Sequence, residues 1–140
     1  MANRVLVVDD EKLIVKGIRF SLEQDGMEVT CAYDGEEALT FAREQQFDII
    51  LLDIMLPDRS GYELCRTIRS ECDCPIIFMS CLEDSETIVG ALKSGGDDYM
   101  IKPFDSKELV ARVKAVLRRF QPARIEEPPA AKTVQYPDLI

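Results

Sequence analysis

The sequence has 140 residues, enough for one globular domain with a sizeable core and little beyond it. Hydrophobic residues make up 46% of the chain, which indicates a globular protein rather than a disordered one. The net charge of −9 disfavours binding to nucleic acid, because an acidic surface repels phosphate backbones. Histidine is absent, so histidine-dependent nucleophilic catalysis and histidine-ligated metal sites are excluded.

Two further patterns concern location and redox state. No apolar run approaches the ~20 residues that cross a bilayer, and the first ten residues lack the basic and then apolar pattern of a secretory signal. We therefore expect a cytoplasmic protein with no membrane partner. The odd count of five cysteines then predicts reduced, structural thiols rather than disulfides.

Five short apolar runs alternate with amphipathic segments along the chain. The runs that predict strands are residues 5–8, 27–31, 48–52, 76–79 and 99–101. The first, third and fourth are continuously hydrophobic, which is typical of parallel strands buried on both faces.

The segments between the runs have helical spacing. In chain order, the apolar faces of the predicted helices are Ile14, Ile18 and Leu22; Ala38, Phe41 and Ala42 within residues 35–44; Leu64 and Ile68 within residues 63–70; Ile88, Val89 and Leu92; and Leu109, Val113, Val116, Leu117 and Phe120. Glycine turns at Asp25-Gly26 and Gly95-Gly96 mark two helix ends. Five successive β-α units predict right-handed crossovers and one parallel sheet.

The chain changes character after Phe120. Residues 121–134 contain three prolines among alanines and charged residues, which predicts a linker. We therefore assign residues 1–120 to one domain and residues 121–140 to a linker and the start of a further segment. On this interpretation the chain is a piece of a longer protein.

Polar side chains follow four of the predicted strands. Asp9 and Asp10 follow the first, Asp53 the third, Ser80 the fourth and Lys102 the fifth. Ligands of open α/β sheets bind outside the carboxyl ends of the strands, so we expect these groups to lie together. Three acids in one place repel one another unless a cation intervenes. Hard oxygen ligands select Mg²⁺, with Mn²⁺ as an alternative, and the added lysine indicates phosphoryl chemistry.

The strand ends suggest separate roles. Asp53 follows a buried strand and is suited to attack phosphorus as a carboxylate nucleophile. Asp10 would ligate the metal directly and Asp9 through water, while Lys102 and Ser80 would contact the phosphoryl oxygens. Such a transfer needs positioning and charge neutralisation rather than a proton relay. Each residue alone also fits an ordinary cap, turn or surface charge, so their joint placement is what favours chemistry.

Several motifs occur together in this chain. They are VLVVDDE at residues 5–11, ILLDIMLP at 50–57, GDDY at 96–99, KPF at 102–104 and ELVARV at 108–113. With these motifs the chain, from about residue 4 to residue 119, resembles the receiver domain of two-component response regulators, specifically the OmpR/PhoB-type transcription factors.

The resemblance implies a fold and a reaction. The fold is a flavodoxin-like (βα)5 doubly wound parallel sheet of the α/β class, with strand order 2-1-3-4-5. A sensor histidine kinase would donate a phosphoryl group to Asp53, with Mg²⁺ bound by Asp9, Asp10, Asp53 and the backbone carbonyl of Met55. The domain would act in signalling, catalysing only its own phosphorylation and dephosphorylation, and would not be an enzyme in the usual sense.

The resemblance also implies a conformational switch. Ser80 and Tyr99 would form the switch pair, the hydroxyl moving toward the phosphoryl group and the aromatic ring turning inward. The peptide bond between Lys102 and Pro103 would be cis.

Activation in the resembled subfamily pairs two copies through the fourth helix, fifth strand and fifth helix. The matching charged positions are Asp97, Asp98, Glu108, Arg112 and Arg119. Ile88 stands where a basic partner of Glu108 is usual, which puts one dimer ion pair in question, although an exposed pair contributes only ~0–1 kcal/mol. Gly96 and Cys81 stand where alanine is common. DNA would be bound only by a separate winged-helix domain. Residues 135–140 would be the start of that domain.

Three alternative functions remain. A haloacid-dehalogenase-type phosphatase needs a second acid two residues after its nucleophile, where this chain has Met55. An FMN-binding flavodoxin needs a hydroxyl- and glycine-rich phosphate loop after strand one, where this chain has acids. A pseudo-receiver usually lacks part of the acid, hydroxyl and lysine set.

Overall fold

The computed structural model describes residues 2–120, so the expected linker and following segment at 121–140 lie outside the described residues. The strands are β1 (Arg4–Val8), β2 (Glu28–Ala32), β3 (Ile49–Asp53), β4 (Ile76–Ser80) and β5 (Asp98–Ile101). The helices are α1 (Lys12–Gln24), α2 (Gly35–Glu44), α3 (Gly61–Glu71), α4 (Ser85–Lys93) and α5 (Ser106–Phe120). None of these helices is long and apolar enough to cross a membrane.

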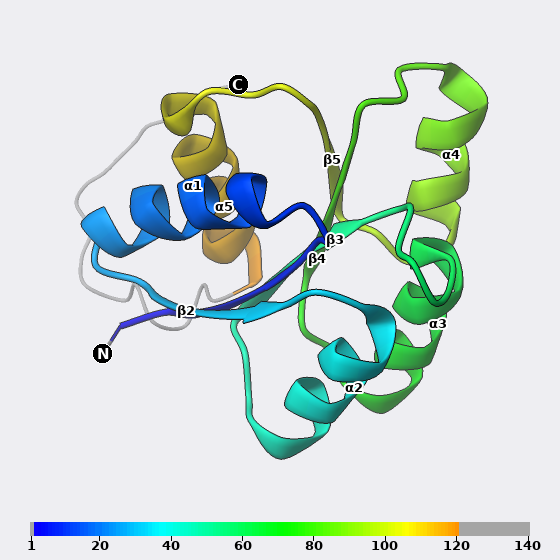
Figure 1. Ribbon diagram of the computed structural model, residues 1–140, viewed down its shortest axis with the longest axis horizontal. Helices are drawn as coiled ribbons and strands as arrows, with labels where there is room; N and C mark the ends of the chain where they lie inside the picture. The colour runs from blue at the N-terminus through cyan, green and yellow to red at the C-terminus, as the bar shows by residue number, and fades with distance from the viewer. Residues whose placement is uncertain (1, 121–140) are drawn as a thin grey trace.

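The five strands form one parallel sheet in the order β2-β1-β3-β4-β5. Helices α1 and α5 cover one face, and α2, α3 and α4 cover the other (Figure 1). The continuously apolar strands β3 and β4 are buried along their whole length, because helices cover both of their faces. The predicted flavodoxin-like α/β fold and strand order are therefore confirmed.

The register of the sheet brings the polar strand ends level with one another. Val8 pairs with Leu52 between β1 and β3. The residues that follow them, Asp9 and Asp53, therefore lie side by side at the carboxyl edge of the sheet. On the other side of β3, Asp53 pairs with Met79 of β4. The centre of the carboxyl edge is thus formed by β1, β3 and β4.

Most helix boundaries have a local cause. Side chains of Asp34, Ser60 and Asp84 cap α2, α3 and α4 by accepting hydrogen bonds from N–H groups of the first turn. Helix α1 ends before Gly26, whose φ of +87° is a left-handed conformation that favours glycine. Gly95 has a φ of +117° in the turn after α4.

Two predicted apolar faces are wrong in part. In α4 only Ala91 is buried, whereas Val89 and Leu92 are 47% and 44% exposed. Ile88 is partly buried against the core. In α5 the predicted stripe is buried up to Leu117, but Phe120 is 45% exposed because it lies at the last residue of the helix, past the buried stripe.

Candidate functional site

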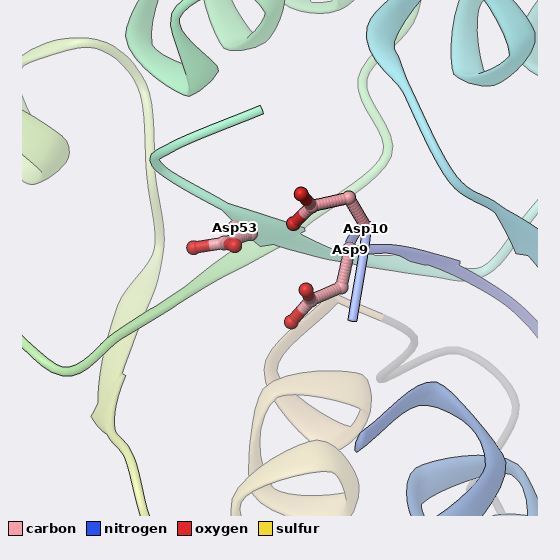
Figure 2. Close-up of side chains that lie close together, drawn as sticks. All are labelled: Asp9, Asp10 and Asp53. Atoms are coloured by element: carbon pink, nitrogen blue, oxygen red, sulfur yellow. The ribbon is translucent and has the colours of Figure 1, made fainter. Parts of the chain in front are cut away.

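Three carboxylates meet at the carboxyl edge of the sheet. Asp9 and Asp10 follow β1, and Asp53 is the last residue of β3 (Figure 2). One oxygen of each lies within 4.8 Å of the others. Asp9 is fully buried and Asp53 nearly so, whereas Asp10 is exposed. The predicted acidic cluster is therefore present, with a solvent-facing member beside two buried ones.

Lys102, which follows β5, supplies the cation of the cluster. Its Nζ donates a hydrogen bond to Asp9 Oδ2 at 2.7 Å and lies 3.5 Å from Asp53 Oδ2. A third carboxylate, Glu11, is 3.3 Å from the same Nζ. Burial acts to lower the pKa of Lys102, but the hydrogen bond with Asp9 and the charges of Asp53 and Asp9 outweigh it and raise the pKa. Lys102 is therefore charged at neutral pH.

The electrostatics of the cluster act most strongly on Asp53. Burial is the largest effect and the charge of Asp9 the second, and together they raise the pKa of Asp53 to about 6. Lys102 and the N–H of Met55 oppose this shift without cancelling it. The site therefore has more negative charge than its one lysine neutralises, which is the condition under which a divalent cation binds well.

The donor set fits Mg²⁺ or Mn²⁺ on its chemistry. All three side chains offer carboxylate oxygens, and the described residues around them contribute no sulfur or nitrogen ligand to the cluster. Mg²⁺ keeps part of its water shell and binds through one or two carboxylates, so an exposed Asp10 beside buried partners suits it. The backbone of Met55 lies next to the same cluster, because its N–H donates to Asp53 Oδ1 at 3.4 Å.

A cavity of about 800 Å³ opens from the cluster toward α1 and the start of α5. Among the residues that line it are Asp10, Asp53, Met55, Ser80 and Lys102. Its far wall is apolar and includes residues of α1 and α5. The predicted nucleophile, hydroxyl and ammonium therefore face one solvent-accessible space.

The two predicted switch residues meet at one point of the β4–α4 loop. The Ser80 Oγ accepts a hydrogen bond from the N–H of Leu82 at 3.1 Å. The hydroxyl of Tyr99 donates to the carbonyl of Leu82 at 2.8 Å, and its ring is buried, with 8% of the residue exposed. The peptide bond between Lys102 and Pro103 is cis, as the resemblance implies.

The charged positions predicted for a dimer interface do not all lie in one cluster. Asp98, Glu108 and Arg112 form a surface cluster, in which Arg112 bonds to Asp98 at 3.2 Å and to Glu108 at 3.1 Å. Asp97 instead accepts from Arg69 at 2.9 Å and from the N–H of Ile76 at 2.8 Å.

The last of the charged positions, Arg119, donates a hydrogen bond to the backbone carbonyl of Asp97, at 3.4 Å. The carboxylate of Asp97 thus connects the end of α3 to the start of β4. No local pattern indicates this role, because Arg69 is 28 residues away from Asp97 along the chain.

The chain is similar to known proteins in sequence and in fold. A model of the response regulator receiver domain matches residues 5–114. The chain belongs to the response regulator receiver domain family. Receiver domains are signalling domains that interact with histidine kinases and generally bind Mg²⁺ at an acidic pocket.

Solved structures agree with this assignment. A two-component response regulator from Clostridium difficile is 39% identical, with a TM-score of 0.83 over 85% of this chain and 98% of that one. A CheY-like receiver domain protein from Methanospirillum hungatei is 29% identical, with a TM-score of 0.84 over 88% and 99%. The OmpR/PhoB homologue DrrB of Thermotoga maritima is 39% identical, with a TM-score of 0.79 over 86% of this chain and 54% of that chain.

Proposed function

We propose that this receiver domain accepts a phosphoryl group on Asp53 from the phosphohistidine of a sensor kinase, in a reaction that requires Mg²⁺. The observation that supports this most directly is the meeting of Asp9, Asp10 and Asp53 within 4.8 Å beside a cavity that Lys102 also lines. In the transfer, an Asp53 oxygen would form a bond to phosphorus while the bond from phosphorus to the donor nitrogen breaks. The imidazole would leave with the electron pair.

The residues around Asp53 would bind the metal and contact the phosphoryl group. Asp10, Asp9, Asp53 and the carbonyl of Met55 would hold the metal. When bound, Mg²⁺ supplies charge neutralisation for the phosphoryl oxygens. Lys102, now 2.7 Å from Asp9 and 3.5 Å from Asp53, would give a further hydrogen bond to the incoming group.

The hydroxyl of Ser80 would transmit the change. To reach a phosphoryl oxygen it would give up the hydrogen bond from the Leu82 N–H and alter the loop to which Tyr99 is bonded. That loop leads into α4, so phosphorylation would be felt at the surface of α4, β5 and α5.

We further propose OmpR/PhoB-type output, in which this surface pairs two copies and a separate winged-helix domain binds DNA. In support, α4 and β5 carry exposed apolar residues, which are Val89, Leu92 and Ile101. Asp98 of β5 and Glu108 and Arg112 of α5 form an ion-pair cluster on the other two elements of this surface. The length of DrrB, of which the match covers 54%, also agrees with a further domain in that homologue. Light scattering should then show dimers after phosphorylation, and Arg112→Glu should weaken them. A phosphorylated chain that stays monomeric would contradict this part.

The central proposal is tested by phosphorylation with acetyl phosphate or phosphoramidate in the presence of Mg²⁺. Intact mass should increase by one phosphoryl group, and peptide mapping should locate it at Asp53. Asp53→Asn should abolish the adduct, and the exposed Asp73→Asn should retain it. An adduct that persists in Asp53→Asn, or that forms equally well in excess chelator, would refute the assignment.

A further inference from the structure

The loop of residues 54–60, which joins β3 to α3, is closed tightly at its base. Met55 forms an antiparallel bridge with Ser60, and the N–H of Gly61 donates to the carbonyl of Ile54 at 2.7 Å. Gly61 packs so closely that a Cβ atom there would collide with the carbonyl oxygen of Asp53. The base of the loop is therefore held in place against the backbone of Asp53.

The tip of the same loop is fastened to a different element. The two carboxylate oxygens of Asp58 accept hydrogen bonds from the N–H groups of Gly35 at 2.8 Å and Glu36 at 3.0 Å. These are the first two residues of α2, whose N–H groups have no partner within the helix. A carboxylate at this end is also favoured by the helix dipole. Figure 1 shows α2 and α3 side by side on the same face of the sheet.

Arg59 reinforces the attachment. Its side chain lies across Gly35, where a Cβ atom would come within 2.6 Å of the Arg59 Cδ. Its Nη2 bonds to Glu36 at 3.1 Å, and its Nε lies 3.8 Å from Asp58. Although burial is the largest effect and acts to raise it, the pKa of Asp58 is lowered by the hydrogen bonds from Gly35 and Glu36, so the carboxylate remains charged at neutral pH.

We propose that Asp58 is a positioning residue for the metal site: by fastening the loop to α2, it fixes the backbone of Met55 beside Asp53 and so raises the affinity for Mg²⁺. This inference rests on the proposed function, because it assigns the Met55 carbonyl to the metal. Groups that orient metal ligands typically contribute about 10- to 100-fold in affinity, and a group that acts through a loop should contribute less. Loss of Asp58 should therefore weaken Mg²⁺ binding roughly 3- to 10-fold.

Asp34 offers a matched control on the same helix end. It also accepts a hydrogen bond from an α2 N–H, that of Glu37 at 2.8 Å, but it belongs to the segment before α2 and not to the loop. Asp34→Ala and Asp58→Ala should each lower the melting temperature of the domain to a similar degree, since each removes a carboxylate that caps α2. Only Asp58→Ala should weaken Mg²⁺ binding.

The experiment measures Mg²⁺ affinity by calorimetry for the parent chain and for Asp34→Ala, Asp58→Ala and Asp58→Asn. The asparagine variant keeps the size of the side chain but places an NH₂ group where one N–H needs an acceptor. We expect weaker binding in both Asp58 variants, together with phosphorylation by phosphoramidate that approaches the parental level at saturating Mg²⁺.

Parental affinity in both Asp58 variants would overturn the inference, as would an equal loss in Asp34→Ala, which would indicate general loosening of α2. If the parent chain itself bound no Mg²⁺ or accepted no phosphoryl group, the proposed function would fail first, and this inference with it. Mg²⁺ binding and phosphorylation of the parent chain therefore distinguish a failure of the proposed function from a failure of the inference about Asp58.

Discussion

A Cβ atom at Gly96 would lie 2.6 Å from the ring of Phe78, so the large side chain on β4 occupies the space that an alanine would need. The ring of Phe78 therefore leaves no room for a side chain at position 96. Gly96→Ala should therefore lower the free energy of unfolding by about 1 to 3 kcal/mol, the usual cost of overpacking a buried site. Urea unfolding followed by circular dichroism measures it.

The matched test of this size relationship is a double variant. Phe78→Leu alone should be destabilising, because it leaves a cavity in the core. Combined with Gly96→Ala it should cost less than the sum of the two single changes, because the new methyl group fills part of that cavity. Strict additivity would show that the two positions do not compete for the same space.

The stability of the metal-free domain should depend on pH through Asp53. Its pKa is raised from 3.8 to about 6 in the fold, so the native state binds more protons than the unfolded chain between these values. The contribution of Asp53 to the free energy of unfolding therefore falls as pH rises through this window. Asp53→Asn should remove that fall and be more stable than the parent by about 2 kcal/mol at pH 7. Urea unfolding in chelator from pH 4 to 7.5 measures the difference, and a difference independent of pH would contradict it.

Lys102 should stabilise the domain because it neutralises a buried acid. Its Nζ is 2.7 Å from Asp9, whose side chain is fully buried, so Lys102→Ala leaves a buried charge without its partner. A loss of about 3 kcal/mol in unfolding free energy is expected at pH 7. Lys114→Ala is the matched control, since Lys114 forms a 3.0 Å pair with Asp25 at the surface and should cost under about 1 kcal/mol. Equal losses in the two variants would show that burial of the pair has no influence.

Mg²⁺ should raise the melting temperature, because it binds the native acids and not the unfolded chain. At ten times its dissociation constant the gain is about 1.4 kcal/mol, or roughly 5 °C for a domain of this size. Asp10→Asn should remove most of this gain without lowering the melting temperature in chelator, because Asp10 is exposed. Differential scanning calorimetry checks both parts, and an undiminished Mg²⁺ effect in Asp10→Asn would exclude it as a ligand.

Local patterns in the sequence were sufficient for the sheet and the acidic edge, because strand burial and strand-end polarity recur at each β-α unit. They were insufficient for α4, where residues 88, 89, 91 and 92 are all apolar. With apolar residues around so much of the helix, periodicity cannot select the buried face, and packing against α3 and β5 leaves only Ala91 inside. Which contacts form is then decided by tertiary packing.

The partners of several charged residues were likewise beyond local patterns. The resemblance implied a dimer position for Asp97, and nothing in the local pattern indicated that its carboxylate lies beside Arg69. The side chain of Glu11 makes no cap bond with α1 and lies 3.3 Å from Lys102, 91 residues away, a contact that no local pattern indicates. The attachment of Asp58 to α2 depends on the same kind of long-range placement.

The shared contact of Ser80 and Tyr99 with Leu82 has a consequence for how such a switch can vary. Only the amide hydrogen and the carbonyl oxygen of Leu82 take part, and its side chain is 38% exposed. Any amino acid except proline supplies the same two groups. The side chain at position 82 can therefore vary, for example to suit a different partner. The hydrogen bonds that connect the Ser80 hydroxyl and the Tyr99 side chain through the backbone would be kept.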